Sequence, residues 1–223
     1  MYNEEKKKSV KTRHYFLYNE DKNIVYIRIP KNGMQTCGDL VKFGYRSETD
    51  LKTIDWHKNR FITFIRNPLE RFISAFFQHE RNRVECKQIK PLNEYSKNEI
   101  INDFVEEINK IKECNLNHMG RFDEHYLSQK YYLGEKFGVA FLPIDVYLIF
   151  ENFIEEFNRV LRPSSKMPDN YELSWQNKNK DFELTEYIRL YISANRDIKN
   201  LINNKYKEDW IIYLEQPKRR IKK

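Results

Sequence analysis

The chain has 223 residues, of which 40% are hydrophobic and 33% are charged. This balance excludes an intrinsically disordered chain and predicts one globular domain with a sizeable core. The formal net charge of +7 favours an anionic partner, a class that includes nucleotides, nucleic acids, acidic glycans and membrane surfaces, without choosing among them.

The cysteines and the apolar residues indicate the expected environment. Cys37, Cys86 and Cys114 are an odd and sparse set that makes no disulfide framework, and none has the spacing of a zinc site. The first residues lack the apolar run of a secretory signal, and the most apolar stretch, residues 139–150, is too short to span a bilayer. We therefore expect a cytoplasmic protein with free thiols and no membrane span.

Strands and helices alternate in the first part of the chain. Residues 1–22 are polar and predict an irregular lead-in. Residues 23–30 (NIVYIRIP) are β-branched and aromatic and predict a buried strand, followed by a helix over residues 36–44 that Thr36 caps. Residues 60–65 (RFITFI) predict a second strand, and Pro68 suits the first turn of a helix that runs from Leu69 to about Arg83. Loops are expected over residues 45–59 and 84–97.

The second part of the chain is richer in helices. Apolar periodicity predicts helices over residues 97–114, 151–161 and 184–214, a short helix over residues 123–133, and a third strand at residues 146–150. Strands that alternate with helices predict an α/β fold of three layers, with a central, mainly parallel sheet flanked by helices. We expect one domain over residues 23–214 and a basic tail over residues 215–223.

The turn PKNGMQT, which follows the first predicted strand, has the features of a phosphate-binding loop. Backbone N–H groups of such a turn point into one concavity, and the helix that follows adds partial positive charge. Gly33 allows the backbone to approach an anion closely, Lys31 can reach a terminal oxygen, and Thr36 can donate its hydroxyl. The alternative is an ordinary strand-to-helix turn with a surface lysine.

The order of residues in this turn argues against a nucleoside triphosphatase. The loop of those enzymes reads GxxxxGK[ST], with the lysine after the second glycine and a hydroxyl on Mg²⁺. Here Lys31 precedes Gly33, and no second glycine follows at that spacing. The main reason to expect a metal ion is therefore missing, and we expect none.

The second predicted strand ends in another motif, RNPLERFISAF, at residues 66–76. Arg66 stands at the carboxyl end of the strand and Ser74 on the helix that follows. The carboxyl edge is where α/β sheets bind ligands, and the planar fork of an arginine suits a doubly charged phosphate. A single ligand can be shared by both motifs only if they meet at one edge of the sheet.

Together, IPKNG and FIRNPLERFISAF resemble the PAPS-dependent sulfotransferases, most closely the carbohydrate sulfotransferase branch, whose donor is 3′-phosphoadenosine 5′-phosphosulfate (PAPS). The resemblance implies that the first motif holds the 5′-phosphosulfate, that Arg66 and Ser74 hold the 3′-phosphate, and that Arg71 is structural and pairs with a carboxylate near the loop. The residues implied at the 5′ end are Lys31, Asn32, Gly33, Met34, Gln35 and Thr36.

The resemblance extends more weakly over residues 23–214. It implies a P-loop-type fold, PAPS as co-substrate, adenosine 3′,5′-bisphosphate as product, and a hydroxyl or amine of a saccharide as acceptor. Similar segments recur at residues 123–129, 150–153 and 206–210. Met34 and Gln35 depart from the family pattern, which has small residues or Ser/Thr at these positions.

Sulfuryl transfer to a hydroxyl calls for a group that stabilises the leaving oxygen and for a general base. Lys31 is the natural group for the first role. His57 is the preferred base, because related enzymes often place theirs between the two donor motifs, and His125 is the second choice. Asp55 and Glu48 are carboxylate alternatives, and Asp55 can instead pair with His57. His14 and His79 are interpreted as hydrogen-bonded or solvated side chains.

Two other classes of function stay open at this stage. One is a P-loop kinase of small molecules, against which the missing GxxxxGK[ST] loop and the Arg66–Ser74 pair both speak. The other is a non-catalytic module that binds a nucleotide or a polyanion. The net charge permits such a module, but no RNP, zinc or helix-turn-helix signature supports a nucleic-acid partner, so none is expected.

Overall fold

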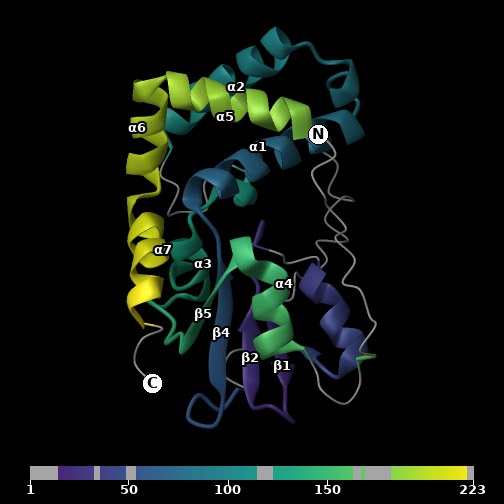
Figure 1. Cartoon of the computed structure of the whole chain (residues 1–223), viewed down its shortest axis with the longest axis vertical. Helices are drawn as coiled ribbons and strands as arrows, with labels where there is room; N and C mark the ends of the chain where they lie inside the picture. The colour runs from purple at the N-terminus through teal and green to yellow at the C-terminus, as the bar shows by residue number, and fades with distance from the viewer. Residues whose placement is uncertain are drawn as a thin grey trace, which may run out of the picture.

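A computed structural model describes residues 15–32, 36–48, 54–114, 123–162, 167–168 and 182–219 of the chain. Its centre is a five-stranded sheet in the order β3-β1-β2-β4-β5 (Figure 1). The strands are β1 (Phe16–Asn19), β2 (Ile24–Ile27), β3 (Arg46–Glu48), β4 (Arg60–Ile65) and β5 (Val146–Ile149).

The centre of the sheet is parallel and one edge is antiparallel. β2 pairs with β4, and β4 with β5, in parallel, while β1 pairs antiparallel with both β2 and β3. The predicted α/β fold with a mainly parallel core is therefore confirmed, and the predicted strands correspond to β2, β4 and β5.

Two strands, β1 and the edge strand β3, correct the sequence-based expectation. β1 lies in the segment 1–22, which was expected to be an irregular lead-in, and β3 lies in the expected loop 45–59. β1 forms a hairpin with β2, and Asn23 closes the turn with a φ of 50°, in the left-handed region that asparagine tolerates. β3 (RSE) is short and polar, whereas β1 (FLYN) is as long as β2 but lies within an otherwise charged segment.

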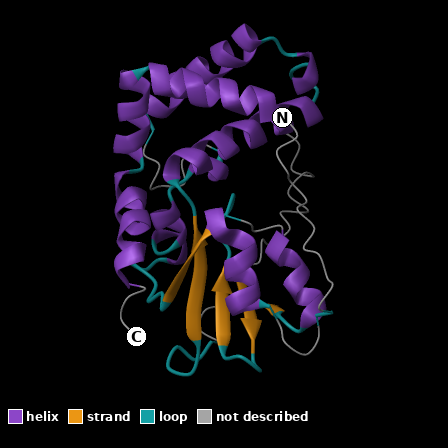
Figure 2. Cartoon of the chain, in the orientation of Figure 1, coloured by secondary structure: helices purple, strands orange, loops and turns teal. Residues whose placement is uncertain are grey.

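Helices surround the sheet (Figure 2). The α-helices are α1 (Pro68–Glu85), α2 (Lys97–Lys112), α3 (Gln129–Tyr132), α4 (Phe153–Glu156), α5 (Phe182–Ala194), α6 (Arg196–Lys205) and α7 (Lys207–Arg219). The shorter helices are η2 (Thr36–Phe43), η4 (Leu92–Glu94), η5 (Glu124–Tyr126), η6 (Glu135–Phe137), η7 (Phe150–Asn152) and η8 (Phe157–Leu161). Because α7 continues to Arg219, the first part of the expected tail 215–223 is helical. Among the described helices, none is long and apolar enough to cross a membrane.

The layers follow from the alternation of side chains along the strands. On one face, Tyr26 and Phe64 pack against Leu40 of η2, Phe153 of α4 and Phe157 of η8. The opposite face is covered by α3 and by the partly buried Ile212 and Tyr213 of α7 (Figure 1). The three predicted layers are therefore present.

A second group of helices lies beyond the end of the sheet at which β4 leads into α1 (Figure 1). There α1 packs against α2, α5 and α6 around an aromatic core that includes Phe72, Phe76 and Phe104. Asn67 caps α1, because its Oδ1 accepts from the backbone N–H of Leu69 at 3.0 Å. This cap fixes the direction in which α1 leaves the sheet, and with it the face that α1 turns toward the end of β2.

Candidate functional site

The ends of β2 and β4 bring the two sequence motifs together. The strands are parallel, with Ile27 opposite Thr63, so their carboxyl ends lie at the same edge of the sheet. Arg66 Nη1 donates to the main-chain oxygen of Lys31 at 3.1 Å. Lys31 has a φ of 69°, so the chain reverses sharply just after the strand. The convergence that a shared ligand requires is therefore present.

The amine of Lys31 lies among other cations, and among the described residues its hydrogen-bond partner is a neutral amide. Its Nζ donates to the neutral Oε1 of Gln78 on α1 at 3.2 Å. Burial lowers the pKa of Lys31 to about 7, and the positive charges of Arg81, Arg66 and Arg71 add to the shift. Because a bound anion would offset both causes, this group of cations is suited to phosphate or sulfate.

Asn32 shapes the loop from within the core. The residue is fully buried, and its Nδ2 donates to the backbone oxygen of Phe64 at 2.8 Å and to Oε1 of Gln129 at 2.6 Å. Both amide hydrogens are therefore used inside the protein, which gives the Asn32 side chain a supporting role. Gly33, Met34 and Gln35, which the sequence also assigns to the 5′ end, lie outside the described residues. The side chain of Thr36 lies outside them as well.

Arg66 is held by an aromatic ring and flanked by carboxylates. Its guanidinium lies over the ring of Phe150, 4.8 Å from the centroid. Burial lowers the pKa of Arg66 to about 10, and Glu70 and Glu151 oppose the shift, so the side chain is charged at neutral pH. Glu70 is itself engaged, since Arg189 of α5 donates from Nε to its Oε1 at 2.9 Å. The aromatic stacking keeps the fork of Arg66 in a defined position.

Ser74 lies on the side of α1 that faces Lys31. Glu70, Ser74 and Gln78 are spaced four residues apart, so they share one face of the helix, which starts just after Arg66. Lys31 contacts residues on both sides of Ser74 in the chain. Its main-chain oxygen accepts from Arg66, which precedes α1, and its amine donates to Gln78 on α1. Ser74 therefore lies between Arg66 and Gln78 along the chain, on the same helix face as Gln78, and its assignment to the 3′-phosphate stays a prediction.

His57 lies at the opposite end of the sheet, which corrects its assignment as the preferred base. It precedes β4, whereas Arg66 follows it, and the six residues of that strand span ~20 Å at ~3.3 Å each. The side chain is exposed, and its backbone N–H donates to Oδ1 of Asp55 at 2.9 Å. Asp55 lies at the same far end. The side chain of Glu48 lies outside the described residues.

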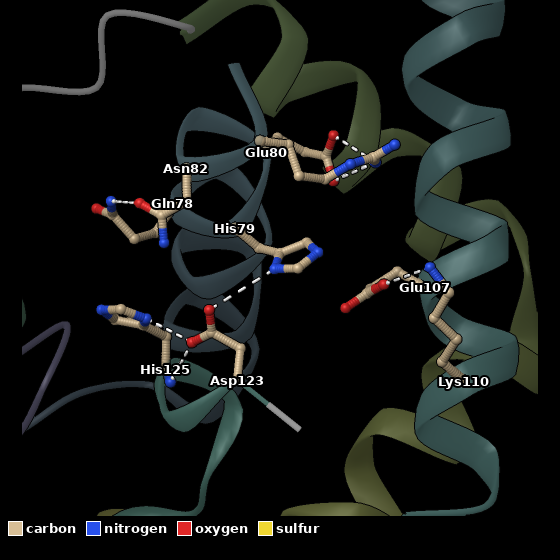
Figure 3. A network of polar contacts seen from close by, with 9 residues as sticks. Gln78, His79, Glu80, Asn82, Glu107, Lys110, Asp123 and His125 are labelled. Carbon is tan, nitrogen blue, oxygen red and sulfur yellow. Dashed lines mark hydrogen bonds and ion pairs between the residues drawn. The ribbon is translucent and has the colours of Figure 1, made fainter. Parts of the chain in front are cut away.

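His125 lies near the converging turns, and Asp123 orients it. Nδ1 of His125 is 2.5 Å from Oδ1 of Asp123, and Nδ1 of His79 is 3.6 Å from the other carboxylate oxygen. Figure 3 shows the His125 ring turned toward the side of α1 that carries Gln78, and the His79 ring turned toward α2. Of the predicted bases, His125 is therefore the one that the fold places on the side of Lys31. His14 and His118 lie outside the described residues.

The two histidines determine the charge of Asp123. Burial by itself would raise the pKa of this carboxyl group, but the hydrogen bonds that it accepts from His125 and its contact with His79 outweigh burial and hold the pKa well below its usual range. The nearby carboxylate of Asp123 in turn raises the pKa of His79. A permanently ionised carboxylate can keep an imidazole in one orientation, as in other sites that use an acid–histidine pair.

Arg71 lies deeper than expected. It is 0% exposed, and none of its guanidinium nitrogens has a hydrogen-bond partner among the described residues. The ring of Tyr132 lies 5.9 Å away, and the carboxylate that opposes its charge is Asp209 of α7. The predicted pairing with a carboxylate is therefore electrostatic, without a hydrogen bond.

Sequence reasoning did not identify three residues that shape the site. Gln78 could have been found from its four-residue spacing to Ser74, and Asp123 from its place two residues before His125. Gln129 was noted only as part of a segment. Its contacts are to residues 63 and 97 positions away, which no local pattern reveals.

Comparison with known proteins gives one match. The model of the sulfotransferase family matches residues 14–213, which includes both converging motifs and His125. No curated protein and no solved structure is significantly similar to the chain.

Proposed function

Because the chain belongs to the sulfotransferase family, we propose that it transfers a sulfuryl group from PAPS to a hydroxyl or amine of a saccharide, leaving adenosine 3′,5′-bisphosphate. The observation that carries the proposal is the contact between Arg66 and the main-chain oxygen of Lys31, which unites the two donor motifs at one edge of the sheet. The saccharide as acceptor is supported by the resemblance of these motifs to the carbohydrate sulfotransferases.

The charges at this edge fit a donor that is anionic at both ends. Lys31 is surrounded by other cations and bonded to a neutral amide, so a sulfated phosphate can replace Gln78 as its partner. Arg66 just before α1 and Ser74 on α1 supply a fork of donors and a hydroxyl for the 3′-phosphate. In this assignment the 5′ end of PAPS lies at the turn after β2, and the 3′ end lies along the first turns of α1.

The reaction requires proton transfer and stabilisation of charge. The acceptor oxygen attacks sulfur, the bond between sulfur and the bridging phosphate oxygen breaks, and the acceptor proton passes to His125. Protonated Lys31 stabilises the negative charge that grows on the leaving oxygen. Asp123 keeps the His125 ring oriented and stabilises the imidazolium that forms.

A binding experiment tests the donor assignment. Unfolding of the protein is followed separately with adenosine 3′,5′-bisphosphate, with ATP plus Mg²⁺, and with a single-stranded oligonucleotide. The bisphosphate, at ~100 times its dissociation constant and without metal, is expected to stabilise the fold by about 2.7 kcal/mol. A preference for ATP–Mg²⁺ would indicate a kinase, and stabilisation by the oligonucleotide alone, fading with salt, would indicate a nucleic-acid module.

The pKa of Lys31 makes donor binding depend on pH. Phosphate groups have their second pKa near ~6, so the charge of the bisphosphate is nearly constant above pH 7. Lys31 loses its proton above its pKa of about 7, and its protonated fraction then falls by up to about tenfold per pH unit. The dissociation constant measured by calorimetry is therefore expected to rise between pH 7 and 9. A constant value over this range would contradict the role of Lys31.

Stability of the ligand-free protein is expected to move in the opposite direction. In the unfolded chain a lysine has a pKa of about 10.4, so between about pH 7 and 10 the unfolded state binds more protons at this position. The contribution of Lys31 to stability therefore increases with pH in this range. The matched control is Lys31→Met, which is expected to flatten both dependences.

A further inference from the structure

The side chain of Gln129 takes no direct part in the proposed reaction, yet it lies between the two turns that the reaction uses. This residue begins α3 and is 0% exposed, so it cannot contact solvent. Its Oε1 accepts from the backbone N–H of Arg66 at 2.9 Å and from Nδ2 of Asn32 at 2.6 Å. Its Nε2 donates to the backbone oxygen of Arg66 at 2.9 Å. One amide therefore joins the turn after β2 to the turn after β4.

The bonds of Gln129 fix the relative position of these two turns. The Gln129 side chain accepts from the N–H of Arg66 and donates to its C=O. The peptide groups on either side of the Arg66 Cα are therefore hydrogen-bonded as they would be to a neighbouring strand. Asn32 is fixed at the same time, because its other amide hydrogen goes to the backbone oxygen of Phe64. Rotation of either turn would break at least one buried hydrogen bond.

Gln129 is in turn held by the C-terminal helix α7. The two carboxylate oxygens of Asp209 accept from the backbone N–H groups of Gln129 at 2.7 Å and Lys130 at 2.9 Å. Asp209 is 0% exposed and lies close enough to Arg71 for their charges to interact. The carboxylate thus binds the free N–H groups at the start of α3, which is the end of a helix where negative charge is favourable.

We infer that Gln129 is a positioning residue for the donor site: it locks the Lys31 turn and the Arg66 turn into one arrangement, and Asp209 of α7 keeps it in place. The inference rests on the proposed function, because it assumes that these turns bind the two ends of one nucleotide. Gln129 does not contact the donor in this assignment. It sets the separation between the residues that do.

The test compares affinity for adenosine 3′,5′-bisphosphate in the wild type, Gln129→Met and Gln129→Glu. Methionine has a similar length and makes none of the three bonds, so affinity is expected to fall about tenfold or more. Glutamate keeps the accepting oxygen for Asn32 and for the Arg66 N–H, but toward the Arg66 carbonyl it donates only when protonated and presents a second acceptor when ionised. An intermediate loss is therefore expected for Gln129→Glu.

A matched control separates positioning from general destabilisation. Tyr45 is buried and its hydroxyl donates to the backbone oxygen of Leu161 at 2.8 Å, a bond that involves none of the residues assigned to the donor. Tyr45→Phe removes that bond and is expected to lower the melting temperature without changing bisphosphate affinity. If Gln129→Met, folded at the temperature of the assay, binds the bisphosphate within twofold of the wild type, the inference is overturned.

Hydrogen exchange in the wild type gives a readout that depends on no variant. The Arg66 amide lies in a turn, yet it is expected to exchange slowly because Gln129 accepts its hydrogen. Rapid exchange of this amide would overturn the inference even if both Gln129 variants fail to fold. Failure of the proposed function looks different, because the wild type itself would then not bind the bisphosphate.

Discussion

Replacement of His125 by alanine is expected to lower the turnover number by ~10²–10⁴-fold, the usual contribution of a general base. The reason is geometric: among the predicted bases, this imidazole has an orienting carboxylate and lies on the Gln78 side of α1 (Figure 3). Affinity for adenosine 3′,5′-bisphosphate is expected to stay within about twofold, because the donor contacts come from other residues. The measurement is a steady-state assay with saturating donor, combined with calorimetry.

Two histidine variants serve as controls for that result. His57→Ala is expected to leave turnover unchanged, since the residue is exposed at the far end of β4. His79→Ala removes the second contact of Asp123 and is expected to cause a smaller loss than His125→Ala. Unchanged turnover in His125→Ala together with a large loss in His57→Ala would refute the assignment of the base.

Replacement of Arg66 by alanine is expected to weaken bisphosphate binding by about 100-fold or more. Charged hydrogen bonds contribute about 1.5–3 kcal/mol each, and a 3′-phosphate can accept two from one guanidinium, where 1.4 kcal/mol corresponds to a factor of ten. The variant also loses the contact with the Lys31 carbonyl, so the two turns are held less tightly. Arg66→Lys keeps the charge without the planar fork and is expected to give an intermediate affinity.

Arg46 offers a matched control for this prediction. Its guanidinium also lies over an aromatic ring, 4.8 Å from the centroid of Tyr18, but it belongs to the edge strand β3. Arg46→Ala removes one positive charge and one stacked arginine, and bisphosphate affinity is expected to remain within about twofold. Equal affinities for the wild type and Arg66→Ala would remove the 3′-phosphate site from this position.

Elements with a strong local signal were predictable from the sequence. β2 and β4 are runs of β-branched and aromatic residues next to turn signals, and α1 carries its cap and its proline in the first turn. β3 (RSE) carries no such signal, and the aromatic run of β1 (FLYN) is surrounded by charged residues. Their strand geometry comes from pairing with neighbours, since β1 is held between β2 and β3.

The residues of the candidate site also differ in whether a local sequence signal predicts their place. Lys31 and Arg66 follow predictable strands, so their place at one edge of the sheet could be anticipated from the parallel topology. His57 was misplaced because position between two motifs in the sequence does not reveal at which end of a strand a residue lies. Gln129 and Asp209 act through contacts between distant segments, and these depend on tertiary packing that spacing alone does not encode.

The dependence of α3 on Asp209 has a consequence for biosynthesis. Both turns that are proposed to bind the nucleotide precede in the chain the carboxylate that anchors α3. A nascent chain that still lacks α7 already carries Lys31 and Arg66, but not the Asp209 carboxylate that holds the start of α3. Under the proposed function, the nucleotide site is therefore completed only when α7 has been made and docks against the rest of the fold.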